Sequence, residues 1–314
     1  MARRSIYAYR RILSGKYTAI PKWANSENGI ELLPIILCGS WNEKNDGDRE
    51  FIEELTGLEY SKLKPLLLKW RDVPDAPFRF VDPIWTVNAK EDAWRLLANY
   101  ATVDNISHFV DKALEVLSEE DPKKKLPEEE RITAELKGVK RRFSNSLRND
   151  LADSLSMLGA LGNNPKFKLA DNTDTTSYAE KIVNLLIEKA INQPSFWHDI
   201  SDQLQKLSEA APDRFLNKIE SDLKKYNSTV LTLFEGQEGI ISTNYDFPEL
   251  LWALEKLAWS PSYFTRVVMI LAELHKKAPE TNIVNSAYGS LISFFRLWLP
   301  QCGANIEQRF VAID

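Results

Sequence analysis

The sequence predicts a mainly α-helical protein, in which an N-terminal winged-helix-like module with a small β-hairpin is followed by a solenoid-like array of α-helical hairpin repeats. Three observations lead to this fold class. Glycine accounts for only 12 of 314 residues, and long aliphatic side chains are abundant, which favours helices over a β-sandwich. One short segment, residues 78–87, is rich in β-branched and aromatic residues. After residue 88 no further segment has the pattern of a strand, and apolar residues recur at helical spacing.

These patterns predict a chain of four consecutive regions. They are an N-terminal helical lead at 1–29, the winged-helix-like module at 30–90, a helical pair with a long helix at 91–162, and the α-helical repeat region at 163–314. The four arginines of the lead, Arg3, Arg4, Arg10 and Arg11, are not followed by an apolar run. We therefore interpret them as the solvated face of a short helix and not as a targeting signal.

The module begins with the apolar run Ile30–Leu37 and continues with a short helix in DREFIEELTG. Phe51 and Leu55 share one face of that helix, and Gly57 can close it in the left-handed conformation. The next stretch, EYSKLKPLLLKW, predicts another helix, with Ser61 as its N-cap.

A β-hairpin is expected after these helices. Pro65 fits the first turn of the preceding helix, and PFRFVDPIWTV then contains two β-rich runs separated by a turn at Asp82-Pro83. A helix, a helix–turn–helix and a hairpin, in that order, are the elements of a winged helix.

Beyond the module, helices are expected in pairs. KEDAWRLLANYA and VDNISHFVDKALEVLSEEDP form the first pair, and a single long helix then runs through ERITAELKGVKRRFSNSLRNDLADSLSMLGAL to about Leu161. A later pair lies in LLWALEKLAWSPSYFTRVVMILAELHKKAP, where Pro261 ends one helix and Ser260 can cap the next. QEGIISTNYD, 237–246, is expected to be a surface loop.

Trp94 and Trp252 each lead such a pair, and each pair ends in a proline. The spacing is typical of degenerate helix-hairpin repeats, whose apolar faces are buried only when the pairs stack. Ordinary helical core produces the same spacing, so both interpretations stay open. Under either one, we expect both tryptophans to be buried anchors of their helix pairs.

Charge and cysteine content limit the classes of partner and compartment. The net charge of −5 gives no global attraction to nucleic acid or to an anionic membrane. Cys38 and Cys302 are far apart and suggest no disulfide framework, and no apolar run reaches the roughly 18 residues of a membrane span. The expected location is the bacterial cytoplasm, with no membrane association.

A search for catalytic motifs finds none. His108, His198 and His275 have no partner at metal-ligand spacing, and no nucleophile elbow is present. LSGKYT contains Gly-Lys but lacks the upstream glycine and the following hydroxyl residue of a phosphate loop. We therefore expect no enzymatic activity, no cofactor and no metal.

Two basic stretches are candidate contacts with a partner or with phosphate. The helix after Ser61 carries Lys62, Lys64, Lys69 and Arg71, and the expected long helix carries Arg141 and Arg142. A winged helix with a basic recognition helix can enter a DNA groove. However, apolar residues occupy much of this helix and few polar side chains remain to read bases. A packing module with a solvated basic face is the alternative interpretation.

Several segments together resemble one protein family. They are LCGSWNEKNDGDREFIEELTG, DAWRLLANYATVDNISHFVDKALEVLSEEDP, SNSLRNDLADSLSMLGALG, LSEAAPDRFLNKIESDL, LLWALEKLAWSPSYFTRVVMILAEL and WLPQCGANIEQRF. They look like the central helical region of large bacterial STAND-type NTPases, including those of AVAST-like antiviral defence. The resemblance covers most of the chain from about residue 5 onward and includes no catalytic motif.

In that family a nucleotide-binding domain precedes a winged helix and a helical-repeat sensor, which recognises a foreign protein and triggers oligomerisation. The resemblance thus implies a non-catalytic protein-recognition and sensing scaffold, as a fragment or split part of a STAND-type defence NTPase. NTPase activity is not carried over, because the phosphate-loop and Mg²⁺-binding motifs are absent. The expected partner is a protein, either a phage protein or other domains of the same NTPase system. The alternative function is a winged-helix DNA-binding regulator.

Overall fold

A computed structural model describes residues 20–236, 245–279, 285–296 and 298–312. The helical lead expected at 1–29 and the loop expected at 237–246 fall largely outside these residues. The chain forms two compact units, and each draws on two segments of sequence. Unit 1 consists of Met1–Leu117 and Arg141–Ala179, and unit 2 consists of Ser118–Lys140 and Glu180–Asp314.

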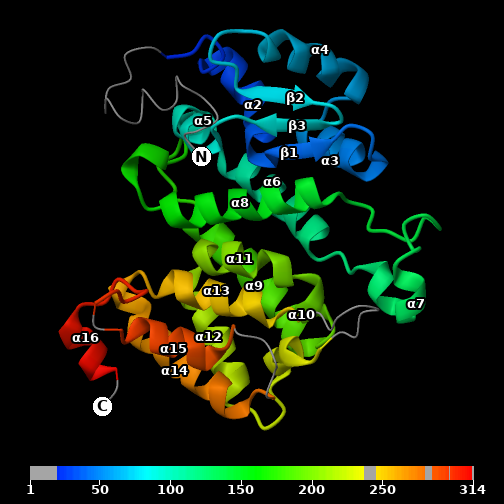
Figure 1. The fold of residues 1–314 in the computed structure, drawn as a ribbon. Helices are drawn as coiled ribbons and strands as arrows, with labels where there is room; N and C mark the ends of the chain where they lie inside the picture. Colours follow the sequence, from blue (N-terminus) through cyan, green and yellow to red (C-terminus); the bar gives the residue numbers. More distant parts are fainter. Residues whose placement is uncertain (1–19, 237–244, 280–284, 297, 313–314) are drawn as a thin grey trace. The chain divides into compact units, whose positions relative to one another are not determined.

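Unit 1 opens with alternating helices and short strands (Figure 1). In order, these elements are α2 (Ser26–Cys38), β1 (Ser40–Asn42), α3 (Asp46–Thr56), α4 (Tyr60–Arg71), β2 (Phe78–Val81) and β3 (Ile84–Val87). The prediction of a mainly helical chain with a β-hairpin at 78–87 is confirmed.

The three strands form one antiparallel sheet in the order β1-β3-β2. Trp85 of β3 lies opposite Trp41 of β1 and opposite Phe80 of β2. The Trp41 and Trp85 rings stack with centroids 6.0 Å apart, and both are fully buried. Such cross-strand aromatic pairs fix the register of a short sheet. Helix α4 packs beside β2, and α8 packs against β1.

Helix α3 is capped by the residues that flank it, whereas the start of α4 is capped by a side chain of α3. Asn45 caps α3 by accepting a hydrogen bond from the Asp48 backbone N–H, and Gly57 ends it in the left-handed conformation, as predicted. Helix α4 begins at Tyr60, one residue before the predicted N-cap Ser61. The Glu53 carboxylate instead accepts the Tyr60 backbone N–H, so the cap comes from the preceding helix. Pro65 lies inside α4, beyond the first turn in which it was expected.

The rest of unit 1 is helical. It contains α5 (Lys90–Leu97), the 3-10 helix η2 (Ala98–Tyr100), α6 (Val103–Leu117), α8 (Asn145–Leu161), the 3-10 helix η4 (Pro165–Phe167) and the first turn of α9 (Thr176–Asn192). The pair predicted after residue 88 is present as α5 and α6. Trp94 is fully buried in α5, as predicted.

The single long helix predicted up to Leu161 is wrong. Only Glu128–Arg131 (α7) and the residues from Asn145 onward are helical, because Gly138 has φ +78° and breaks the run. Ser144 then caps α8 through its side chain. The segment before α8 lies against the start of α3, where a Cβ on Gly47 would come within 2.5 Å of the Arg142 carbonyl oxygen.

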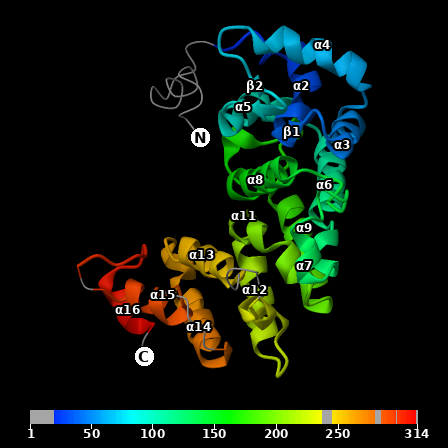
Figure 2. The same cartoon turned by 45° about the vertical axis from the view of Figure 1, so that its right-hand side comes forward.

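Unit 2 is built from short helices. They are η3 (Pro122–Lys125), α7, most of α9, α10 (Phe196–Asp199), η5 (Ser201–Gln203), α11 (Leu204–Ala210), α12 (Pro212–Leu223), η6 (Thr229–Phe234), α13 (Phe247–Leu257), α14 (Pro261–Lys277), α15 (Ala287–Phe294) and α16 (Ile306–Val311). Helix α11 packs against α13, and α12 packs against α14 (Figure 1, Figure 2). The hairpins α11–α12 and α13–α14 therefore lie next to one another. Nowhere in the described ranges is a helix both long and apolar enough to span a membrane.

The break between α13 and α14 falls at Pro261, as predicted. Ser260 is the N-cap residue of α14, but its hydroxyl contacts Ser262 and not a backbone N–H of the helix. The prediction that Trp252 is a buried anchor is wrong, since 44% of its surface is exposed. The buried stripe of α13 runs through Phe247, Leu250, Leu254 and their neighbours, and Trp252 lies on the opposite side of the helix.

Glu120 gives unit 2 a pH-dependent contact. Hydrogen bonds from Lys125 and Gln193 lower the pKa of its carboxyl to about 2, and Lys189 of α9 lies 3.4 Å away. A lowered folded-state pKa gives stability that is present above the unfolded pKa, roughly 4.3, and is lost as the pH falls toward the folded value.

We predict that Glu120→Gln lowers the free energy of unfolding by at most about 1 kcal/mol near neutral pH, since the contact is partly exposed. The difference from the parent should shrink toward zero between about pH 5 and pH 2. Urea unfolding at several pH values measures it, with Glu129→Gln as the matched control on an exposed side chain. A difference that stays constant across this window contradicts the assignment.

Candidate functional site

The predicted basic residues of α4 face solvent, but acidic side chains accompany them. Lys64 lies 3.2 Å from the Glu43 carboxylate, and Lys62 lies 4.0 Å from Glu59. The Lys62–Glu59 pair is exposed on both sides and contributes little to stability. The effect of both pairs is on charge, because carboxylates on the same surface reduce the positive potential that a phosphate backbone would meet.

In the second half of α4, an acidic side chain again balances a basic one. Both ends of the Arg71 guanidinium donate to Asp72, from Nε at 2.9 Å and from Nη2 at 2.7 Å. Lys69 places its ammonium 4.6 Å from the centre of the Trp70 ring. The basic stripe predicted from the sequence is thus present, but its charge is largely balanced where it lies.

Glu43 joins α4 to the sheet. Its carboxylate accepts hydrogen bonds from Trp85 Nε1 at 3.1 Å, Tyr60 Oη at 3.0 Å and Lys64 Nζ at 3.2 Å. Partial burial raises the pKa of Glu43, but these three bonds outweigh it and hold the pKa below its ordinary value. Burial and the neighbouring Glu43 charge raise the pKa of Tyr60. Lys64 is therefore part of the structure that holds α4 against the sheet.

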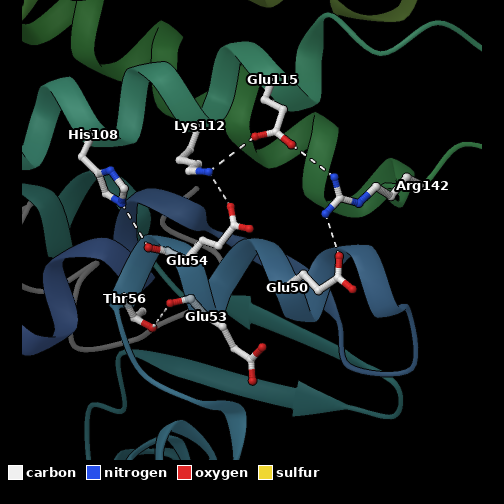
Figure 3. Close-up of polar contacts among 8 residues, drawn as sticks. All are labelled: Glu50, Glu53, Glu54, Thr56, His108, Lys112, Glu115 and Arg142. Atoms are coloured by element: carbon white, nitrogen blue, oxygen red, sulfur yellow. Dashed lines mark hydrogen bonds and ion pairs between the residues drawn. The ribbon is translucent and has the colours of Figure 1, made fainter.

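Arg142 belongs to an ion network between α3, α6 and the segment before α8 (Figure 3). Its guanidinium contacts Glu50 at 2.6 Å and Glu115 at 3.2 Å, and these acids raise its pKa. Lys112 joins the network through Glu54 and through Glu115, the latter at 3.5 Å. Arg141 is half-buried. The structure thus places Arg142 in a structural role within unit 1 and not beside the basic residues of α4.

A pocket of about 310 Å³ opens between α2, α3 and α6 in unit 1. Its wall is formed by Ile30, Glu31, Leu33, Pro34, Leu37, Leu55, Thr56, Leu58, Asn105, His108 and Phe109. The apolar residues on its floor belong to the core, whereas Glu31 and His108 are exposed. His108 Nε2 lies 3.1 Å from the Glu54 carbonyl oxygen (Figure 3), so this nitrogen carries the proton. This pocket was not predicted from the sequence, because its wall comes from three helices that are separated along the chain.

Unit 2 exposes two tryptophans at and just after α13. Trp252 of α13 is 44% exposed, and Trp259, two residues beyond the end of the helix, is 58% exposed. Trp259 belongs to the turn that follows α13. Gly303 closes against the turn that carries Trp259, since its N–H donates to the Ala258 carbonyl at 3.0 Å. A Cβ at Gly303 would lie 2.0 Å from the Trp259 carbonyl oxygen. The backbone beneath Trp259 is therefore tightly held.

A second groove, of about 450 Å³, lies between α12 and α14. Met269 is 58% exposed there, and Leu223 and Ile270 form its apolar floor. Arg266 crosses the groove by donating to Glu220 from Nε at 2.7 Å. The groove has an apolar floor and a charged rim, which is typical of a surface that receives a protein segment.

The three histidines stay apart. His108 binds a backbone carbonyl, His198 Nδ1 lies 2.7 Å from Asp246, and His275 stacks on Tyr288 with ring centroids 5.1 Å apart. In the part of the chain that the structure describes, no group of three His, Cys, Asp or Glu residues could hold a metal ion.

Comparisons with known proteins identified no similar protein. The chain matches no protein-family model, and no curated protein or solved structure is significantly similar to it.

Proposed function

We propose that this chain is a non-catalytic protein-recognition scaffold, composed of a winged-helix-like module and stacked helical hairpins. The observation that carries the proposal is the exposure of Trp252 on α13 and of Trp259 in the turn that follows it. Tryptophan is among the residues that contribute most to protein–protein binding energy, and large exposed aromatic side chains often mark such interfaces. The partner is therefore a protein with an apolar patch that covers both indole rings.

The element order of unit 1 supports the winged-helix part. Helix α2, strand β1, helices α3 and α4, and the hairpin β2–β3 follow one another, with β3 in the middle of the sheet. In this arrangement α4 is the recognition helix and the hairpin is the wing. The acids beside Lys62, Lys64 and Arg71 favour packing against protein over binding to DNA.

The helix contacts of unit 2 support the repeat part. Consecutive hairpins place first helix against first helix, α11 on α13, and second helix against second helix, α12 on α14. This is how hairpin repeats stack into extended binding surfaces. The family resemblance adds that the scaffold serves as a sensor in a bacterial STAND-type antiviral system, in the cytoplasm, with a phage protein or another domain of that system as its partner.

Binding to a protein and binding to DNA are separated by two titrations of the full chain. Duplex DNA at physiological salt should bind no more tightly than the nonspecific range of ~10⁻⁴ to 10⁻⁶ M. Candidate partners are first captured from host and phage-infected lysates. Each is then purified and titrated calorimetrically against the parent chain.

We predict that replacing both Trp252 and Trp259 with serine weakens the reconstituted complex at least about 30-fold, the effect of losing roughly 2 kcal/mol at a binding hot spot. Tyr226→Ser, at a fully exposed aromatic residue of the same unit, should leave the affinity unchanged. Nanomolar and sequence-selective DNA binding that is lost on replacing Lys62, Lys64 and Lys69 with glutamine would overturn the proposal and establish the DNA-binding alternative.

A further inference from the structure

The pocket between α2, α3 and α6 has properties that the proposed protein-recognition function does not use. We infer that it is a binding site for a small primary ammonium compound with an apolar body about the size of a benzyl group. The inference depends only on unit 1 and is independent of the tryptophan surface of unit 2.

The floor of the pocket accepts the apolar body. Leu33 and Leu37 of α2, Leu55 of α3 and Phe109 of α6 line it, and each is at least 94% buried. These side chains are fixed by the core, so the cavity exists before a ligand arrives. A volume of about 310 Å³ is at the lower end of the range for small-molecule sites, roughly 300–1,000 Å³.

A proline in the pocket wall leaves one carbonyl of α2 without its helical donor. Pro34 lies inside α2 and has no backbone N–H, so it cannot donate the helical hydrogen bond to the Ile30 carbonyl four residues earlier. Both residues line the pocket. A backbone carbonyl that lacks its helical donor is a ready acceptor for an ammonium N–H.

The remaining polar groups select a cation over an anion. Glu31 is the acidic residue of the wall, and the wall contains no lysine or arginine among the described residues. His108 donates from Nε2 to the Glu54 carbonyl, which holds its ring at the edge of the pocket. The C-terminal end of α3 also lies at the pocket, through Leu55 and Thr56, and a helix C-terminus carries partial negative charge.

The nearest cations on α6 and before α8 are already held. Lys112 is bound by Glu54 and Glu115, and Arg142 by Glu50 and Glu115 (Figure 3). Neither is a wall residue. A negatively charged ligand would therefore meet Glu31 without a compensating cation, whereas an ammonium group would pair with it.

The test uses three probes of one shape on the full chain: benzylamine, benzyl alcohol and benzoate. Binding is followed by the methyl NMR shifts of Leu33, Leu37 and Leu55. We predict a dissociation constant for benzylamine near ~1 mM, as expected for so small a ligand, about tenfold weaker binding of benzyl alcohol, and no binding of benzoate.

Two variants test the residues at the mouth. Glu31→Gln should reduce the preference for benzylamine over benzyl alcohol to less than about twofold, because the charge is removed at nearly constant shape. Pro34→Ala restores a backbone N–H to the helix and should weaken benzylamine binding about fivefold while leaving the methyl spectrum folded. Glu91→Gln, the same charge change at an exposed site on α5, is the matched control and should change nothing.

Equal binding of all three probes, an undiminished preference in Glu31→Gln, or shifts confined to methyl groups outside the pocket would each overturn the inference. None of these results bears on the complex that depends on Trp252 and Trp259. Failure here and failure of the proposed function are therefore distinguishable.

Discussion

Replacing Trp94 with alanine should lower the free energy of unfolding of unit 1 by about 3–5 kcal/mol, the usual effect of truncating a fully buried aromatic ring. Trp94 has no exposed surface and lies on α5, which packs against α2. Its indole nitrogen has no hydrogen-bond partner among the described residues. The ring therefore stabilises the unit through packing, and alanine would leave a cavity without orphaning a partner.

The matched control is the same substitution at Trp252, where 44% of the surface is exposed. It should cost less than about 1 kcal/mol, as for most surface changes. Urea unfolding followed by circular dichroism measures both variants, with the transitions of the two units fitted separately because a two-unit chain need not unfold in one step. Equal losses at the two positions would contradict the assignment of Trp94 to the core and Trp252 to the surface.

Replacing Asp48 with alanine should cost about 3–5 kcal/mol, because it leaves a set of partly buried donors without the carboxylate that accepts from them. Asp48 is fully buried near the start of α3. Its carboxylate accepts the Asn42 N–H at 2.8 Å, the Ser144 N–H at 2.8 Å and the Ser144 hydroxyl at 2.5 Å. One side chain thus joins the end of β1 to the start of α8.

Two further variants sharpen this prediction. Burial raises the pKa of the Asp48 carboxyl, which shows that holding its charge has a cost. Asp48→Asn, which is neutral and keeps one acceptor oxygen, should therefore lose less than Asp48→Ala. Asp46→Ala, two residues earlier on an exposed side chain that pairs with Arg49, should change stability by less than about 0.5 kcal/mol. Chemical denaturation of the three variants gives the order, and a loss at Asp46 equal to that at Asp48 would refute it.

Sequence patterns predicted the structure correctly where it is determined by residues only a few positions away. The hairpin at 78–87 follows from its β-rich runs and its Asp82-Pro83 turn, and the break before α14 follows from Pro261. The left-handed end of α3 follows from Gly57. In each case the residues that decide the structure lie within a few positions of the structure they determine.

Helix boundaries that depend on residues far away in the sequence were not predicted. Gly138 breaks the predicted long helix, but the place where α8 begins is held by a distant residue, because Ser144 at its N-cap binds Asp48, 96 positions earlier. The start of α4 is capped by Glu53 in place of Ser61, because the preceding helix ends close by. Both errors arise from side chains that bind a backbone outside their own element.

The sequence analysis identified the basic residues of α4 but not the side chains that surround them in the structure. The basic residues of α4 lie at the surface as expected. Two of their acidic neighbours, Glu59 and Asp72, flank the helix in sequence, but Glu43 comes from the end of β1 and was not foreseen. Trp252 was assigned to the core because it leads a helix pair that ends in a proline, as Trp94 does. The phase of the stripe through Phe247, Leu250 and Leu254 would have shown that it faces the other way.

The interleaving of the two units along the chain has a consequence for biosynthesis. Unit 1 is interrupted after Leu117, when Ser118–Lys140 is diverted to unit 2, and it is not complete until Ala179. Helix α8, which covers part of α6 and β1, therefore leaves the ribosome only after the diverted segment. The nascent chain must carry the apolar surface of α6 and β1 that α8 covers in the finished unit until more than half of the polypeptide has been translated. Such delayed closure favours engagement by chaperones during translation, and it means that no single cut in the gene separates one unit from the other.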